Sequence, residues 1–145
     1  MTLNFDKYAQ SGHTFVNKIA AELGDEKDTS TAGRILRSTL HVLRDQSSTE
    51  ESMQFISQLP MFIKAIYVDG WKVSGKKTKV RHLDDFIEEV HKRCRAAGHD
   101  NFTSQEGCYL AVHAVFRVIR EYVSEAEIED LRLTLPEGLR ALLDQ

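Results

Sequence analysis

An internal repeat constrains the fold of this chain more than any other feature of its sequence. A single ungapped offset places residues 36–66 on residues 112–142, and apolar positions fall on apolar positions, as Leu40 does on Phe116. In both copies the apolar residues recur at helical spacing. The sequence therefore predicts two similar helical units within one chain.

The boundaries of the helices also recur at the same offset. Ser48 and Ser124 are each followed three residues later by glutamate, which is the spacing of a capping box that begins a helix. Pro60 and Pro136 coincide as well, and a proline ends one helix and suits the first turn of the next. Each unit is expected to contain a long helix, a second helix, a capped third helix and a short fourth helix that begins at a proline.

Strand signals are nearly absent, so the predicted fold class is all-α, with two pseudo-repeated helical units packed into one compact, bundle-like domain. The single domain covers residues 1–145. Within it we expect repeat one at residues 1–67 and repeat two at residues 84–145. A basic linker at residues 68–83, which lacks helical periodicity and contains two glycines, joins them.

Four segments carry a resemblance to a known family: FVNKIAAELG, AGRILRSTLHVLRD, QLPMFIKAIYVDGW and FRVIREYVSEAEIEDLRLTLP. With these segments the chain resembles, over nearly its whole length, a bacterial family catalogued as domain of unknown function 2267. The resemblance implies a compact helical fold. It brings neither an established activity nor catalytic residues.

The net charge, the amino-terminal sequence and the number of cysteines indicate where the protein is located and which partners it lacks. The formal net charge of −3 gives no reason to expect binding to nucleic acid or to an anionic membrane through bulk charge. The amino terminus has no signal-peptide pattern, and no apolar window is long enough to span a bilayer. Cys94 and Cys108 are too few for a disulfide framework and suit a reducing compartment. We therefore expect a soluble, cytoplasmic protein with free thiols and no membrane partner.

Histidine and cysteine at helical spacing raise the question of a zinc site, formed by His91, Cys94, Cys108 and His113. The repeat argues against it, because both cysteines align with apolar positions of the first unit. His113 aligns with Arg37 and is expected to be solvated. We favour buried thiols and satisfied or exposed histidines, and predict neither a metal nor a cofactor.

Catalytic signatures are missing from the sequence. His41 aligns with Arg117 on the flank of a helix, where we expect it to be exposed, and nothing in the sequence marks a nucleophile or an orienting carboxylate beside it. The clustered acidic residues mostly fall in the first turns of capped helices, where carboxylates stabilise the helix: Glu50, Glu51, Glu125, Glu127, Glu129 and Asp130. No residue is assigned as catalytic.

The basic linker supplies the candidate binding residues Lys72, Lys76, Lys77, Lys79 and Arg81. Such a segment could hold phosphate or nucleic acid, although a solvated connection would have the same composition, and we favour the latter. Tyr67, Asp69 and Trp71 precede the lysines. The tryptophan could anchor a partner or cover the core, and we favour a cover.

Three functions follow, in order of preference. The first is a non-enzymatic helical interaction module that binds another protein or a second copy of itself. The second is the binding of nucleic acid or a phosphorylated ligand through the basic linker. The third is an enzyme that uses His41 or the cysteine and histidine residues.

Overall fold

The computed structural model describes residues 3–98, 102 and 104–144, and in this part of the chain it contains eight helices and no strands. The predicted all-α class is therefore confirmed. The elements are α1 (Phe5–Glu22), α2 (Thr29–Gln46), α3 (Thr49–Ile56), α4 (Met61–Val68), α5 (Leu83–Ala96), α6 (Gln105–Arg120), α7 (Glu125–Thr134) and a closing 3-10 helix, η1 (Glu137–Leu143).

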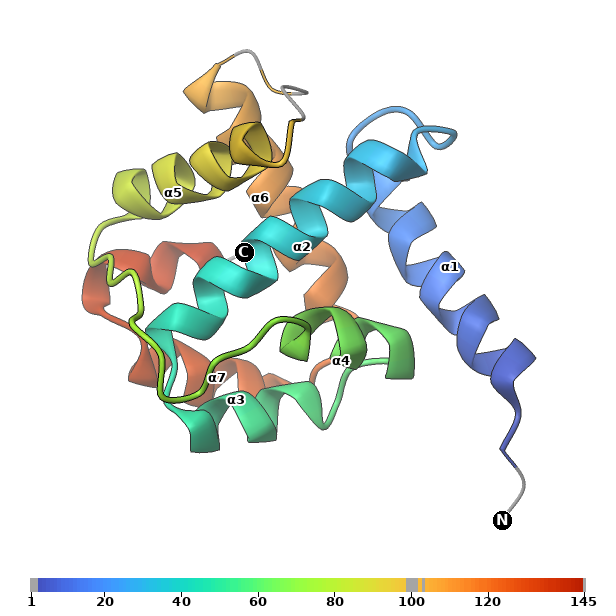
Figure 1. The fold of residues 1–145 in the computed structure, drawn as a ribbon, viewed down its shortest axis with the longest axis horizontal. Helices are drawn as coiled ribbons and strands as arrows, with labels where there is room; N and C mark the ends of the chain where they lie inside the picture. Colours follow the sequence, from blue (N-terminus) through green and yellow to red (C-terminus); the bar gives the residue numbers. More distant parts are fainter. Residues whose placement is uncertain (1–2, 99–101, 103, 145) are drawn as a thin grey trace.

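Helices α2 and α6 pack against each other at the centre of the molecule (Figure 1). Helix α1 packs against α2, α4 and α6, whereas α5 packs against α2, α6 and η1, and α3 lies against α7. Leu40 on α2 and Phe116 on α6 are both fully buried in the shared core. The amino-terminal end of α1 projects from one side of the molecule (Figure 1), so its first turns are exposed.

Helix starts follow the sequence signals, with one difference. The Ser48 side chain accepts a hydrogen bond from the Glu51 amide, and the Glu51 carboxylate accepts one from the Ser48 amide, which confirms the capping box of α3. The Ser124 side chain likewise accepts from the Glu127 amide. The Ser124 amide, however, donates to Gln58 Oε1 at 2.6 Å, because the turn after α3 lies beside the start of α7.

The segment between α4 and α5 crosses the carboxyl end of α2 (Figure 1). Buried Gln46, the last residue of α2, donates to the Thr78 carbonyl at 2.8 Å and accepts from the Val80 amide at 3.0 Å. Lys79 Nζ donates to the Asp45 carbonyl at 2.9 Å. The basic linker is therefore held against the helical body by hydrogen bonds.

Helix α6 is enclosed over most of its length, including every residue of 111–116. His113 lies within this run and is only 8% exposed, so the expectation that it is solvated is wrong. Its aligned counterpart, Arg37, lies at the exposed surface of α2, whereas α6 is covered by several helices. Despite this burial, no helix in the described ranges combines the length and apolar character needed to cross a membrane.

Candidate functional site

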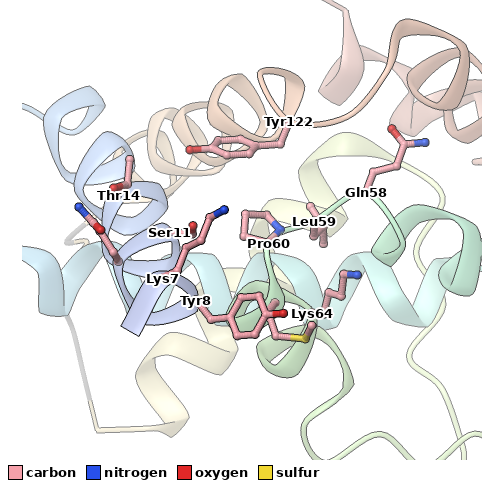
Figure 2. Close-up of a pocket in the computed structure, with 11 residues that line it drawn as sticks. Lys7, Tyr8, Ser11, Thr14, Gln58, Leu59, Pro60, Lys64 and Tyr122 are labelled. Atoms are coloured by element: carbon pink, nitrogen blue, oxygen red, sulfur yellow. The ribbon is translucent and has the colours of Figure 1, made fainter. Parts of the chain in front are cut away.

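A cleft of about 650 Å³ opens between α1, the α3–α4 turn and the carboxyl end of α6 (Figure 2). One wall comes from α1, where Lys7, Ser11 and Thr14 share one side of the helix because their spacing follows the helical repeat. Buried Phe15 and Ile19 fix this helix against the core. The wall is thus set by the packing of α1.

The floor of the cleft is apolar and consists of Leu59, Pro60 and Met61. Leu59 is buried, whereas Met61 is 44% exposed. Pro60 occupies the N-cap of α4, and its extended backbone turns the chain so that Lys64 lines the cleft from α4. Figure 2 shows Leu59 and Pro60 between Lys7, Ser11 and Thr14 of α1 on one side and Gln58 and Lys64 on the other.

Two lysines give the cleft a positive charge. Lys7 comes from α1 and Lys64 from α4, and the eleven lining residues, all within the described part of the chain, include no carboxylate. Tyr8 and Tyr122 add aromatic surface and hydroxyl groups at the rim. The cleft therefore combines a small apolar floor with polar and cationic walls, an arrangement that suits a partly apolar anion.

Tyr122 is fixed in place by its neighbours. Its ring lies 4.8 Å from the ring of buried Phe15, and Lys18 Nζ lies 4.9 Å from its centre. Lys18 also pairs with Glu121 at 3.4 Å, and Tyr122 and Glu121 raise the pKa of this lysine. The charge of Lys18 is thus balanced locally, unlike the charges of the two lysines that line the cleft.

The three candidate residues that precede the linker lysines lie elsewhere, at the carboxyl end of α4. Tyr67 is buried, shares a 2.7 Å hydrogen bond with Ser52 and has its pKa raised by burial to about 12. Trp71 is half-buried and lies edge-on to the Tyr67 ring at 6.1 Å. Asp69 pairs with Arg37, which lowers the pKa of its carboxyl group. Trp71 thus packs on the ring of a buried residue.

Helix α2 supplies the groups that cap this end of α4. Arg44 donates to the Tyr67 carbonyl at 2.7 Å and to the Asp69 carbonyl at 3.0 Å, and its guanidinium lies 5.9 Å from the Trp71 ring. His41 Nε2 donates to the Ile66 carbonyl at 2.7 Å. The expectation that His41 is exposed is wrong, because α4 partly covers it, and this burial lowers its pKa. These contacts join α2 to α4.

The basic residues of the linker do not reach the cleft, because none of them is among the residues that line it. All except half-buried Lys77 are exposed: Lys72, Lys76, Lys79 and Arg81. The structure therefore does not bring the eight predicted binding residues together. Three belong to the α2–α4 junction and five to a separate basic segment.

The cysteine and histidine residues each have their own neighbours. Cys94 Sγ donates to Ser38 Oγ at 3.4 Å, and Cys108 Sγ donates to the Ile87 carbonyl at 3.7 Å. Both cysteines are free and buried, as predicted, and burial raises both thiol pKa values, that of Cys108 to about 12. The reactive thiolate form is thereby disfavoured.

The two histidines of this set also face different groups. His91 Nε2 donates to the Phe102 carbonyl at 2.7 Å, and the His113 ring packs against Tyr109 at 4.4 Å. Within the described residues, no group of three or more histidine, cysteine, aspartate or glutamate side chains has an arrangement that could hold a metal ion.

The fold and the cleft define an all-helical protein with an open, cationic surface site. Residues 12–142 match the model of a family described as an uncharacterized conserved protein, DUF2267, so the chain belongs to this family. A search of curated proteins finds no match. The matched range includes the floor of the cleft, Lys64 and Tyr122, whereas Lys7, Tyr8 and Ser11 precede it.

Sequence reasoning missed the cleft. The polar face of Lys7, Ser11 and Thr14 is visible in the sequence, but a polar helix face is usually just solvated. The residues that complete the site, such as Lys64 and Tyr122, lie far along the chain. Only the packing of α1 against α4 and α6 brings these residues together.

Proposed function

We propose that this protein is a non-enzymatic helical interaction module that binds a protein partner in the cleft between α1, α4 and α6. The observation that carries the proposal is the cleft itself, which has an apolar floor and polar walls. Two lysines line it, and none of its lining residues, all of which the structure describes, is an aspartate or glutamate. Protein interfaces combine apolar centres with polar rims in this way.

The form of the cleft favours a segment of a protein over a small molecule. Pockets for small ligands usually enclose most of the ligand. This cleft is instead open to solvent, and its walls carry polar and cationic side chains. Its walls are helices, and Tyr122 and Gln58 are held by Phe15 and Ser124, so a partner meets a preformed surface.

We also infer that the scaffold is a pseudo-repeat, with units at residues 1–67 and 84–145 joined by the linker at 68–83. Arg44 donates to the Tyr67 carbonyl, and Arg120, at the same offset, donates to the Leu143 carbonyl. The packing of α2 against α5 has a counterpart in that of α6 against α1. These paired contacts support one ancestral unit used twice.

A cytoplasmic location is proposed on the state of the two cysteines. Cys94 and Cys108 are both buried and free. Free thiols persist in reducing compartments, whereas exported proteins more often use their cysteines in disulfides.

The basic linker supports a second candidate, binding of nucleic acid or a phosphorylated ligand. The observation that favours it is that Lys72, Lys76 and Arg81 are exposed on a segment already held in place by Gln46. A preformed row of cations needs little ordering when it meets phosphates. Binding through such contacts must weaken steeply as salt is added.

Replacement of Lys76, Lys77 and Lys79 by glutamate tests this second candidate. If the linker is only a connection, the wild type will show little binding to an oligonucleotide at physiological salt. The triple variant will still fold, although loss of the Lys79 hydrogen bond to the Asp45 carbonyl should lower its free energy of unfolding by about 1 kcal/mol. Fluorescence anisotropy and urea unfolding measure the two quantities. Tight, salt-sensitive binding by the wild type that is lost in the variant would favour the linker over the cleft.

Site-specific photo-crosslinking tests the interaction module in the native host. A photoreactive amino acid replaces Gln10, an exposed residue that lines the cleft, and in a matched control it replaces exposed Lys92 on α5. We expect discrete protein adducts from position 10 and not from position 92, detected by a gel shift and identified by mass spectrometry. Equal labelling at both positions, or none at either, would contradict the proposal.

A further inference from the structure

We propose that the cleft recognises an acidic protein segment, in which an apolar side chain rests on the floor and flanking carboxylates reach the two lysines. The inference rests on the proposed function, because it names the chemistry of the partner at the same site. It commits to one occupant, a peptide segment rich in aspartate or glutamate around an apolar residue.

Charge complementarity is the first argument. Lys7 and Lys64 line the cleft from α1 and α4, on either side of Pro60 (Figure 2). Among the described residues that line the cleft, no aspartate or glutamate neutralises the charges of the two lysines, although the whole chain has a net charge of −3. Two uncompensated cations in an otherwise acidic protein attract an anionic partner and repel a basic one.

The floor explains why the partner must also be partly apolar. Buried Leu59 lies beside Met61, which remains 44% exposed. An apolar side chain of the partner that covers Met61 and Pro60 removes apolar surface from water, which is the main favourable contribution at most interfaces. A purely acidic chain would leave this surface exposed.

Neutral polar groups complete the match to a peptide. Gln58 Oε1 already accepts a hydrogen bond from the Ser124 amide, which leaves its amide nitrogen as a donor. Ser11 and Thr14 contribute hydroxyl groups on the α1 wall. Together they provide donors for the carbonyl groups of an extended backbone between the two lysines.

Nucleic acid fits this cleft less well than an acidic peptide. A polyphosphate backbone gains affinity by contacts with many cations along its length, and here only two lysines line the site. The larger group of exposed basic residues lies on the linker, outside the cleft. An oligonucleotide is therefore a competitor in the test, not the proposed ligand.

The test is fluorescence anisotropy with a labelled peptide in which glutamates and aspartates flank a central leucine and phenylalanine. A matched peptide carries glutamine and asparagine in place of the acids. We expect the acidic peptide to bind, its affinity to fall with added salt, and the matched amide peptide to bind at least about tenfold more weakly.

Charge reversal locates the binding site. Lys7→Glu and Lys64→Glu should each weaken binding by about threefold to tenfold, while Lys92→Glu, the same change at an exposed position of α5, should leave it unchanged. Both test positions lie near helix amino termini, where a carboxylate is favourable, so the variants should fold. Circular dichroism checks that they do.

The outcomes separate this inference from the proposed function. The proposal of an acidic segment would be overturned if both peptides bound equally well, or if Lys92→Glu weakened binding as much as Lys7→Glu and Lys64→Glu. Adducts at position 10 would then still support the interaction module. Tighter binding of an oligonucleotide with the same dependence on Lys7 and Lys64 would also overturn the proposal of an acidic segment. If the wild type neither bound the acidic peptide nor gave adducts at position 10, both proposals would be rejected.

Discussion

Gly138, the second residue of η1, lies against the backbone of the basic linker. A Cβ atom at this position would overlap the Arg81 carbonyl oxygen, and a backbone atom cannot move aside as a flexible side chain can. Gly33 on α2 is the natural comparison, because a Cβ there would have nothing within 4 Å.

We therefore predict opposite effects of the same substitution. Gly138→Ala should lower the free energy of unfolding by about 1 to 3 kcal/mol through overpacking. Gly33→Ala should raise it by about 0.5 to 1 kcal/mol, because alanine loses less backbone entropy in a helix. Urea unfolding of both variants measures these changes. A neutral Gly138→Ala would mean that the linker is free to move away from η1.

The lowered pKa values of His41 and His113 should make the free energy of unfolding depend on pH. Burial lowers the pKa of both below the ordinary value of 6.5, so the folded state binds protons less readily than the unfolded state. Their stabilising contribution is complete above the unfolded pKa and is lost as pH falls towards the folded values. The free energy of unfolding should therefore decrease between about pH 7 and pH 5.

The double variant His41→Gln, His113→Leu tests this assignment. Glutamine keeps a donor for the Ile66 carbonyl, and leucine fills a buried position, so neither residue titrates. The pH dependence of unfolding should become flatter in this range. If the slope is unchanged, other groups cause the pH dependence between pH 7 and pH 5. Asp28 and Asp69 do not contribute in this range, because their lowered pKa values place their titration at more acidic pH.

Helix starts are the feature to test at the scale of elements. Ser48→Ala and Ser124→Ala each remove the side chain that accepts the first-turn amide, at Glu51 and Glu127 respectively. Each change should lower the free energy of unfolding by about 1 kcal/mol, measured by chemical denaturation. Thr49→Ala, next to the first cap, is the control and should have little effect.

The element scale also shows how the linker and α4 are fixed. Arg44 caps the end of α4, and Gln46 pairs with the linker, so two residues of α2 position the segment that follows α4. These polar side chains are buried because their partners are backbone groups of other elements. A helical pattern of apolar residues does not reveal them.

At the scale of the whole molecule the two halves share one core. Helix α1 packs against α6 and α5 against α2, so neither half can bury its apolar residues alone. Leu40→Ala and Phe116→Ala should each lower the free energy of unfolding by about 2 to 5 kcal/mol, through lost burial and a residual cavity. Denaturation followed by fluorescence and circular dichroism should give one shared transition. Two separate transitions would show that the halves unfold independently.

The sequence by itself determined the helices, most of their boundaries and the buried apolar positions. These features depend on neighbours within a few residues, because helical periodicity, caps and prolines act locally. The capping box at Ser48 and the buried cysteines were predictable for this reason. The fourth helix of the second half was expected too, although it forms as a 3-10 helix.

Only the tertiary structure decided where the polar residues lie. Burial of His113 and partial burial of His41 depend on helices that cover them, and Gln58 meets Ser124 because two distant turns lie side by side. The cleft exists for the same reason. Lys7 and Lys64 face one space only after α1 packs against α4, and this contact depends on shape complementarity between distant elements, which no local pattern encodes.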